Sequence, residues 1–204
     1  MYYFDSMILK CFYQNYFMNI LITGTPGTGK TEISKELAKK LKMQLINVNE
    51  LIEKHKFFNK IDKEDNSKIV NLKDLEDYLR NHISSEEGFI VESHLLCELE
   101  LPADFVFVLR THPNLLRSRL SKRKYIKDKL ENNISCEILD YCLLKSESNY
   151  PIEIIYEINT TNKTPIKVIK EIQDILKGKK KNKHIDWSKK IFNEKIDLKK
   201  IKDL

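Results

Sequence analysis

The sequence has no long hydrophobic run, and this absence excludes one broad class of protein. A helix that crosses a bilayer needs about 20 consecutive apolar residues, and no stretch of the 204 residues approaches that length. Hydrophobic residues make up 41% and charged residues 32% of the chain, a balance typical of soluble globular proteins. We therefore predict a protein with no membrane partner.

Cysteine is scarce, and its spacing excludes two kinds of stabilising site. The four cysteines form no Cys-x-x-Cys pair, and none has a histidine nearby at zinc-ligand spacing. This pattern favours neither a disulfide framework nor a structural zinc site. Residues 1–17 lack a basic start and a small-residue cleavage site, so they match a signal peptide poorly. A reducing compartment, the cytosol or the nucleus, is expected.

Positive charge is unevenly distributed along the chain. The formal net charge is +6, yet residues 177–204 hold 11 Lys against 4 Asp or Glu and carry +7. The rest is nearly neutral and has the length of one domain with a single core. We predict an N-terminal extension of unknown role over 1–17, a domain over 18–177 and a lysine-rich tail over 178–204. Such a tail is expected to be mobile until it meets a partner.

Short β-branched runs alternate with longer amphipathic stretches, which indicates βαβ units. The runs are nearly continuous in apolar residues, as in strands buried on both faces of a parallel sheet. The predicted strands are Asn19 to Thr23, Gln44 to Val48, Phe89 to Glu92, Phe105 to Leu109 and Ile154 to Ile158. The predicted helices are Thr31 to Leu41, Lys73 to His82, one after Pro113, one from Leu130 to Leu144 and one after Pro165. We predict an α/β fold with a five-stranded parallel sheet and helices on both faces.

The most specific feature is the segment GTPGTGKT, residues 24–31, which matches G-x-x-x-x-G-K-[ST]. It follows a predicted strand and opens a predicted helix. Gly27 and Gly29 let the backbone curl so that its N–H groups converge on phosphate oxygens at the helix N-terminus. Lys30 is suited to bridge the β and γ phosphates, and Thr31 to offer its hydroxyl to Mg²⁺. The segment predicts a site for ATP with Mg²⁺.

The residues alone leave the subclass of phosphate-binding protein partly open. A GTPase is expected to carry Asn-Lys-x-Asp, and the nearest match, Asn162 to Pro165, has proline in place of the aspartate. Guanine-specific switching is therefore disfavoured. Kinases of small molecules, such as shikimate or dephospho-coenzyme A, remain open on these grounds.

Six short blocks of sequence carry a resemblance to a known family. The blocks are NILITGTPGTGKT from Asn19, INV from Ile46, IVESH from Ile90, VFVLRT from Val106, RLxxRxY from Arg119 and NIxCEI from Asn133. In this order and spacing they resemble the adenylate kinase isoenzyme 6 family, also called coilin-interacting nuclear ATPase. The resemblance implies a P-loop nucleoside monophosphate kinase fold. It places a monophosphate-binding flap over residues 47–70 and a short lid over residues 122–132.

The resemblance also assigns functions to residues outside the loop. It implies that Arg123 is the lid arginine that meets the nucleotide phosphates, for which planar guanidinium donors are suited. Glu92 stands where the family has an aspartate that orients Mg²⁺. His94 either positions the water that attacks ATP or caps the end of its strand. Glu32 completes the nucleotide-binding set at the loop, and Lys163 lies in a segment expected beside the adenine.

Three departures from the family pattern affect these assignments. Glu92 reaches one methylene further than the family's aspartate, and Lys124 replaces a glycine of the lid. The flap contains no arginine, although adenylate kinases usually grip the monophosphate with guanidinium groups. Arg110 and Lys54 are therefore the candidates for that contact.

Two functions follow as hypotheses. The first is a kinase that transfers the γ-phosphoryl group of ATP to AMP or another nucleoside monophosphate and also hydrolyses ATP. Its catalytic residues would be Lys30, Arg123 and His94, which act by positioning and charge neutralisation.

The alternative is an ATPase that acts chiefly in maturation of the small ribosomal subunit and its RNA, with weak kinase activity. The resemblance implies a small-subunit ribosomal protein and a pre-ribosomal particle as partners, and the nucleus and cytoplasm as locations. The lysine-rich tail with Trp187 suits contact with an RNA backbone, or it serves as an import signal.

Overall fold

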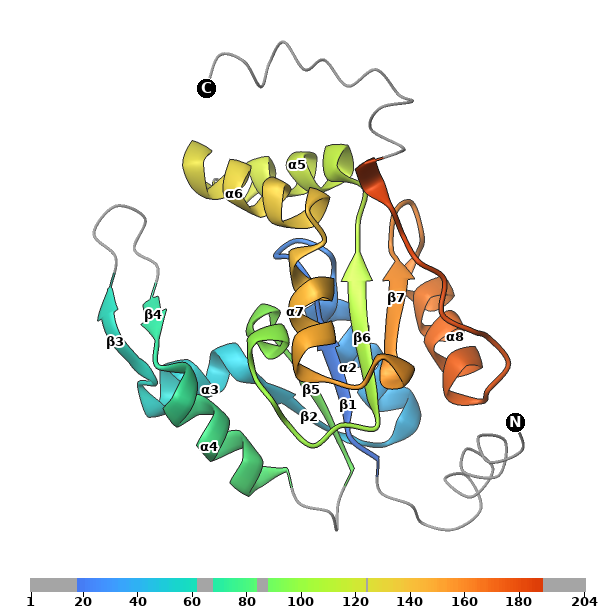
Figure 1. Cartoon of the computed structure of the whole chain (residues 1–204), viewed down its shortest axis with the longest axis horizontal. Coiled ribbons are helices and arrows are strands. Elements are labelled where there is room, and N and C mark those ends of the chain that lie inside the picture. Colours follow the sequence, from blue (N-terminus) through green and yellow to red (C-terminus); the bar gives the residue numbers. More distant parts are fainter. Residues whose placement is uncertain (1–17, 62–67, 84–87, 124, 189–204) are drawn as a thin grey trace.

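The computed structural model describes residues 18–61, 68–83, 88–123 and 125–188. Figure 1 shows a central parallel sheet between layers of helices. The strands are β1 (Ile20–Thr23), β2 (Gln44–Asn47), β5 (Phe89–Glu92), β6 (Phe105–Arg110) and β7 (Ile155–Asn159). They lie in the order β2-β5-β1-β6-β7, and each neighbouring pair is parallel. Each strand agrees with its predicted run to within one residue at either end, so the predicted fold class is confirmed.

Helices cover both faces of this sheet. They are α2 (Lys30–Leu41), α3 (Val48–His55), α4 (Leu72–His82), α5 (Pro113–Lys122), α6 (Lys127–Ile138), α7 (Tyr141–Asn149) and α8 (Pro165–Leu176). Two short 3-10 segments, η1 (His94–Glu98) and η2 (Ile152–Ile154), join them. None of the helices in the described ranges is long and apolar enough to span a bilayer.

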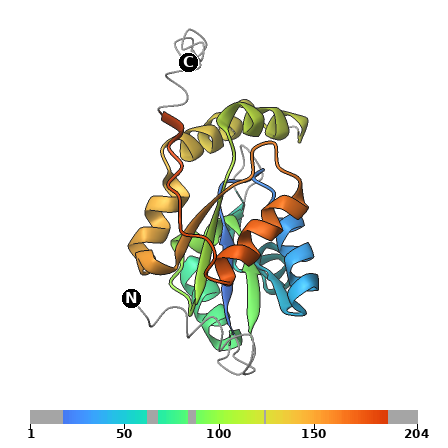
Figure 2. The ribbon, with the colours of Figure 1, turned by 90° about the vertical axis from the view of Figure 1, so that its right-hand side faces the viewer.

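Alternation along the strands gives the sheet two separate apolar cores. Ile20 and Ile22 of β1 point to one face and pack with residues of α2 and α8, among them Leu37 and Ile172. Leu21 points to the other face, where α3, α4, η1 and α7 supply the packing. Figure 2 shows α2 and α8 on one side of the sheet and α7 on the other.

The middle strand β1 sits at the point where the chain changes direction across the sheet. It pairs with β5 on one side and with β6 on the other. In open parallel sheets, ligands bind beyond the carboxyl ends of the strands at such a point. The segment after Thr23 therefore occupies the expected position for a ligand-binding loop.

The segment predicted as one helix from Leu130 to Leu144 is two helices, and that prediction is wrong. Asp140 lies between α6 and α7 with φ of 55°, a left-handed conformation that ends a helix. Aspartate tolerates this conformation better than most residues. Its side chain forms an ion pair with Arg110 of β6, so a tertiary contact holds the break.

The flap range contains elements that the sequence analysis did not predict. Helix α3 begins at Val48, and the side chain of Asn47 caps it by accepting hydrogen bonds from the next backbone N–H groups. An antiparallel pair follows, formed by β3 (Phe58–Ile61) and β4 (Lys68–Val70). These elements and α4 project to one side of the sheet in Figure 1.

The first residues after α8 pack against the domain, contrary to the predicted mobile tail. Residues 179–188, called the strap from here on, return along the edge strand β7 toward the start of α5 (Figures 1 and 2). Trp187 is 1% exposed and Ile185 is also buried. The expectation of a mobile tail is wrong for the strap. Residues 1–17 and 189–204 lie outside the described residues.

Candidate functional site

Residues 24–29 form a tight loop between β1 and α2 that two glycines make possible. Gly24 has φ of 130°, and a Cβ atom there would lie 2.3 Å from the carbonyl oxygen of Leu109. Gly27 has φ of 94°, and a Cβ atom there would lie 2.8 Å from the Leu116 side chain on α5. Any other residue at either position would displace the loop. The loop therefore has the curled backbone that the motif predicts.

Lys30 is folded back into this loop. Its Nζ donates hydrogen bonds to the carbonyl oxygens of Gly24 at 2.7 Å and Thr25 at 3.2 Å. Burial lowers the pKa of Lys30, an effect that nearby charges such as Glu92 oppose. The ammonium group therefore lies where the loop backbone would surround a phosphate. Phosphate oxygens are stronger hydrogen-bond acceptors than these carbonyl oxygens, so a bound phosphate would compete for the ammonium.

The two residues predicted to hold Mg²⁺ lie together. Thr31 Oγ1 donates to Glu92 Oε1 at 3.1 Å, although the two are 61 residues apart. Glu92 is 1% exposed at the end of β5, and burial raises its pKa while Lys30 opposes that rise.

A hydroxyl beside a carboxylate fits Mg²⁺, which prefers oxygen ligands and keeps water and phosphate oxygens around it. No cluster of three or more His, Cys, Asp or Glu suited to a metal occurs among the described residues. Thr31 and Glu92 would therefore hold the ion together with the nucleotide phosphates. The ion would neutralise charge on those phosphates.

His94 begins η1 one residue after β5 ends, and it lines the same cavity as Lys30, Thr31 and Glu92. Burial, together with the positive charges of Lys30 and Lys129, lowers its pKa to about 4. The ring is therefore neutral at pH 7. The side chain of Ser93 accepts the hydrogen bond from Leu95 N–H that caps η1. Ser93 therefore caps η1, and both predicted roles of His94 stay predictions.

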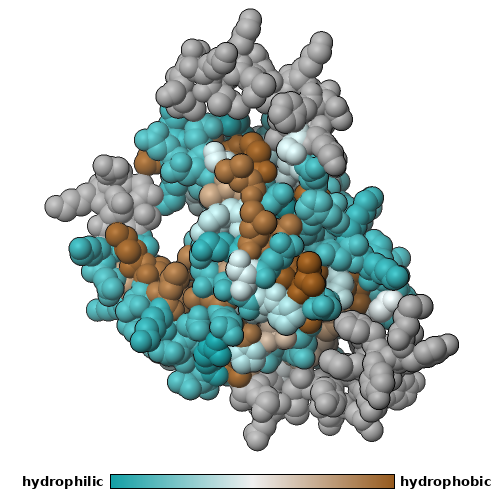
Figure 3. All heavy atoms as spheres, in the orientation of Figure 1, coloured by the Kyte–Doolittle hydropathy of each residue, from teal (hydrophilic) through white to brown (hydrophobic). Residues whose placement is uncertain are grey.

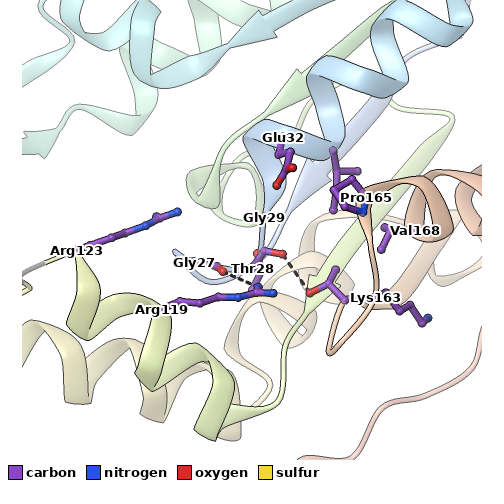
Figure 4. A pocket seen from close by; sticks show the side chains of 11 residues that line it. Gly27, Thr28, Gly29, Glu32, Arg119, Arg123, Lys163, Pro165 and Val168 are labelled. Carbon is purple, nitrogen blue, oxygen red and sulfur yellow. Dashed lines mark hydrogen bonds between the residues drawn. The ribbon is translucent and has the colours of Figure 1, made fainter.

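Two arginines of α5 reach toward the loop. Arg119 Nη1 donates to the carbonyl oxygen of Gly27 at 3.1 Å. Arg123 is the exposed residue that directly follows α5, and Figure 4 shows both side chains directed toward the loop. Arg123 was predicted as a site residue, whereas Arg119 was not. Their spacing of four residues, which puts both on one helix face, was the available signal.

Three adjoining cavities run past the loop. The outer cavity, of about 260 Å³, lies between the loop, α5 and the start of α8. The central cavity, of about 560 Å³, contains Lys30, Thr31, Glu92 and His94 in its lining. The flap cavity, of about 610 Å³, lies between the flap elements and α6. Figure 3 shows a hollow between the flap and the rest of the molecule.

Shared lining residues show that each cavity opens on the next. The outer and central cavities share Gly27, Gly29, Glu32 and Arg123. The central and flap cavities share Pro26, Asn49, His94 and Tyr125. Apart from Lys163, the residues predicted to bind ATP and Mg²⁺ or to act in catalysis all line the central cavity.

Lys163 lines the outer cavity, but its ammonium group is paired with a carboxylate outside that cavity's lining. Its Nζ pairs with Glu171 Oε2 at 2.6 Å, and Figure 4 shows the side chain extending away from Gly29. The neighbouring Thr160 faces the loop instead, and its hydroxyl donates to the carbonyl oxygen of Thr28 at 3.1 Å. The predicted segment lies beside the cavity, and Thr160 is the residue that contacts the loop.

Arg110 is a structural residue, so its proposed contact with a monophosphate is wrong. It is 1% exposed and forms ion pairs with Glu137, Asp140 and Glu157. Burial opposes its charge, but these carboxylates more than offset burial and hold the Arg110 pKa above its ordinary value. Lys54 is exposed on α3 and lines none of the three cavities.

Comparison with solved structures confirms the fold. Shikimate kinase from Acinetobacter baumannii, solved with shikimate, superposes with a TM-score of 0.57 and 17% identity over 84% of this chain and 98% of that one. Shikimate kinase from Aquifex aeolicus gives a TM-score of 0.53 and 16% identity over 79% and 97%. The fold and the loop together define a P-loop protein with the nucleoside monophosphate kinase fold.

Sequence relatives define the family more closely. Residues 20–140 match a family model described as an AAA domain. A protein of Methanocaldococcus jannaschii named “Putative adenylate kinase” is 36% identical over 86% of this chain and 96% of its own length. A protein of Pyrococcus abyssi with the same name is 33% identical over 88% and 96%. The chain belongs to this adenylate kinase-like family.

Proposed function

We propose that the protein is a nucleoside monophosphate kinase of the adenylate kinase isoenzyme 6 type, which transfers the γ-phosphoryl group of ATP to AMP or a related monophosphate. The row of three adjoining cavities carries this proposal. The outer cavity suits a nucleoside, the central cavity suits its phosphates, and the flap cavity leaves room for a second nucleotide. The name of the two relatives, “Putative adenylate kinase”, supports the proposed activity.

Charge neutralisation and positioning account for the chemistry. Backbone N–H groups of the loop, Lys30 and Arg123 supply donors around the central cavity, and Thr31 with Glu92 would hold Mg²⁺. Phosphoryl transfer needs little more, since its transition state is stabilised mainly by fixed positive charge. Movement of Arg123, which is exposed on the α5–α6 hairpin, would close the site against water.

The flap cavity supports acceptor binding without a guanidinium. No arginine lines it among the described residues, and its cations are Lys68 and Lys129. Lys68 pairs with Glu53 in the same lining. Apolar side chains of Ile52, Val70, Leu72 and Leu95 offer a surface for a nucleobase. We therefore expect the monophosphate to bind more weakly than ATP.

Replacement of Lys30 by methionine tests the assignment. The variant keeps the aliphatic stem and removes the ammonium, so phosphoryl transfer from ATP to AMP should fall by at least about 100-fold. ADP production in a coupled assay is the measurement, and circular dichroism checks the fold. Lys39→Met, on an exposed turn of the same helix, should retain full activity. A fully active Lys30→Met enzyme would rule out the proposed function.

Hydrolysis of ATP is proposed as a slower activity of the same site. A neutral imidazole is able to accept a proton from water, and His94 lines both the central and the flap cavity. When no acceptor occupies the flap cavity, water has access to the same position. Phosphate release without AMP should therefore be lost in Lys30→Met together with the kinase activity.

A second candidate, a ribosome-associated ATPase in the nucleus and cytoplasm, is favoured by one observation. Lys179, Lys180, Lys181 and Lys183 are exposed, and such a run suits phosphate backbones. Trp187 adds nothing to this surface because it is buried. Replacement of the four lysines by glutamine should weaken binding to pre-ribosomal particles and reduce its salt dependence. Unchanged binding would remove this candidate.

A further inference from the structure

A single buried carboxylate connects the strap to the phosphate loop. Glu137 of α6 is 1% exposed. Its Oε1 accepts hydrogen bonds from Arg110 Nε at 2.9 Å, Thr111 N at 3.1 Å and Trp187 Nε1 at 2.9 Å. Its Oε2 accepts one from Thr25 Oγ1 of the loop at 2.6 Å. The indole of the strap and the hydroxyl of the loop thus bind the two oxygens of one carboxylate.

The strap is fixed on this network by further contacts. Glu157 Oε1 accepts a hydrogen bond from Ile185 N at 3.1 Å and contacts His184 Nδ1 at 2.9 Å. Glu157 Oε2 accepts from Arg110 Nη1 at 2.7 Å. The Asn182 side chain accepts from Glu157 N at 2.9 Å. Arg110 therefore bridges the two carboxylates that hold the strap.

On the other side, the network reaches Lys30, the residue proposed to bind phosphate. The carbonyl oxygen of Thr25, whose hydroxyl binds Glu137, accepts hydrogen bonds from Lys30 Nζ at 3.2 Å and from Thr28 Oγ1 at 2.9 Å. A change at Glu137 would therefore move Thr25, and with it the loop backbone and the seat of the Lys30 ammonium.

We propose that the strap is part of the nucleotide site and that Trp187 is a positioning residue, which fixes the phosphate loop through Glu137 and Thr25. This inference rests on the proposed function, in which the loop binds ATP. If the indole N–H is removed, a buried carboxylate loses one of its donors and is free to turn toward the others. Thr25 then loses a fixed partner, and the loop is no longer held in its binding shape.

Replacement of Trp187 by phenylalanine isolates this contact because it keeps an aromatic ring and removes the N–H. We expect the Kd for ATP with Mg²⁺, measured by calorimetry, to rise about tenfold, the size of effect typical of one hydrogen bond to a charged group. The KM for ATP should rise in parallel, whereas the KM for AMP should stay within about twofold. A purely structural role would lower the melting temperature without this selective loss of ATP affinity.

Two truncations provide matched controls. Removal of residues 189–204 keeps the strap and should leave the Kd for ATP unchanged. Removal of residues 178–204 should raise it at least as much as Trp187→Phe. If that shorter chain does not fold, Trp187→Phe decides the question. Since Trp187 is the chain's one tryptophan, its emission should also change when ATP binds to the wild-type protein.

The outcomes separate this inference from the proposed function. An active Lys30→Met enzyme would overturn the proposed function whatever the strap does. Loss of activity in Lys30→Met, with wild-type ATP affinity in Trp187→Phe, would overturn the strap inference alone. Replacement of Thr25 by valine, which removes the hydroxyl that binds Glu137, should reproduce the effect of Trp187→Phe.

Discussion

The side chain of His94 makes the free energy of unfolding depend on pH. An ordinary histidine gains its proton near pH 6.5, whereas the folded protein holds the pKa of His94 at about 4. Between these values the unfolded chain binds the proton and the folded chain does not. The contribution of His94 to the free energy of unfolding is therefore present above pH 6.5 and is lost as the pH falls toward 4.

Urea denaturation of wild type and His94→Gln at pH 7 and pH 4.5 measures this contribution. The free energy of unfolding should fall less with acid in the variant than in wild type. His82→Gln, an exposed replacement on α4, should behave as wild type. Equal slopes for all three proteins would show that His94 titrates alike in both states.

At the scale of residues, the sequence predicted groups whose position a motif or a strand end fixes better than groups whose partners depend on how distant elements pack. Lys30, Thr31 and Glu92 were found because a motif and a strand end fix where they lie. Arg110 was misassigned because its acidic partners, 27 to 47 residues further along the chain, belong to no motif that includes it. Nothing in the local sequence of β6 indicates that three carboxylates converge on it.

The hairpin of α5 and α6 is held by a paired contact between the two helices. Both terminal nitrogens of Arg117 bind the two carboxylate oxygens of Glu131, one of them at 2.7 Å. This contact lowers the pKa of Glu131 from its ordinary value of 4.5. Because the pair is partly open to solvent, we expect a coupling of about 0.5 to 1 kcal/mol.

A double-mutant cycle with Arg117→Gln and Glu131→Gln checks the coupling by urea denaturation at pH 7. The lowered pKa means that the stabilisation is present above pH 4.5 and is lost as the pH falls through the folded value. The coupling should therefore shrink at pH 3. A coupling of zero at pH 7 would show that apolar packing of Leu120 with Leu130 and Ile134 holds the hairpin alone.

Helices and strands were also predicted best where the local sequence alone determines them. The five strands were predictable because buried parallel strands are nearly continuous apolar runs. The boundary between α6 and α7 was not, since the residues on both sides continue a helical pattern and the break depends on Asp140 meeting Arg110. The pair β3–β4 is short and rich in lysine, so it lacks the alternation that indicates a strand.

For the whole molecule, coupling between the strap and the loop must act in both directions. If the strap raises affinity for ATP, ATP must stabilise the strap by the same free energy. The amide hydrogen of Ile185, bound to Glu157 Oε1, should therefore exchange with solvent about tenfold more slowly when ATP and Mg²⁺ are saturating. The effect should disappear in Trp187→Phe.

Exchange measured by NMR or mass spectrometry provides the comparison. The amide of Leu79 in α4, which is remote from the network, serves as the reference. A strap amide that ATP leaves unchanged, while the loop amides become protected, would contradict reciprocal coupling.

The position of Trp187 in the sequence also affects how the protein becomes functional during its synthesis. The phosphate loop emerges early, and Trp187 follows Lys30 by 157 residues. At 5 to 20 residues per second, roughly 8 to 30 s separate the two. If the strap has the proposed role, the phosphate loop of a nascent chain is already synthesised during this interval, but it does not bind nucleotide tightly because the strap is still missing. Tight nucleotide binding would therefore begin only after the strap has been synthesised.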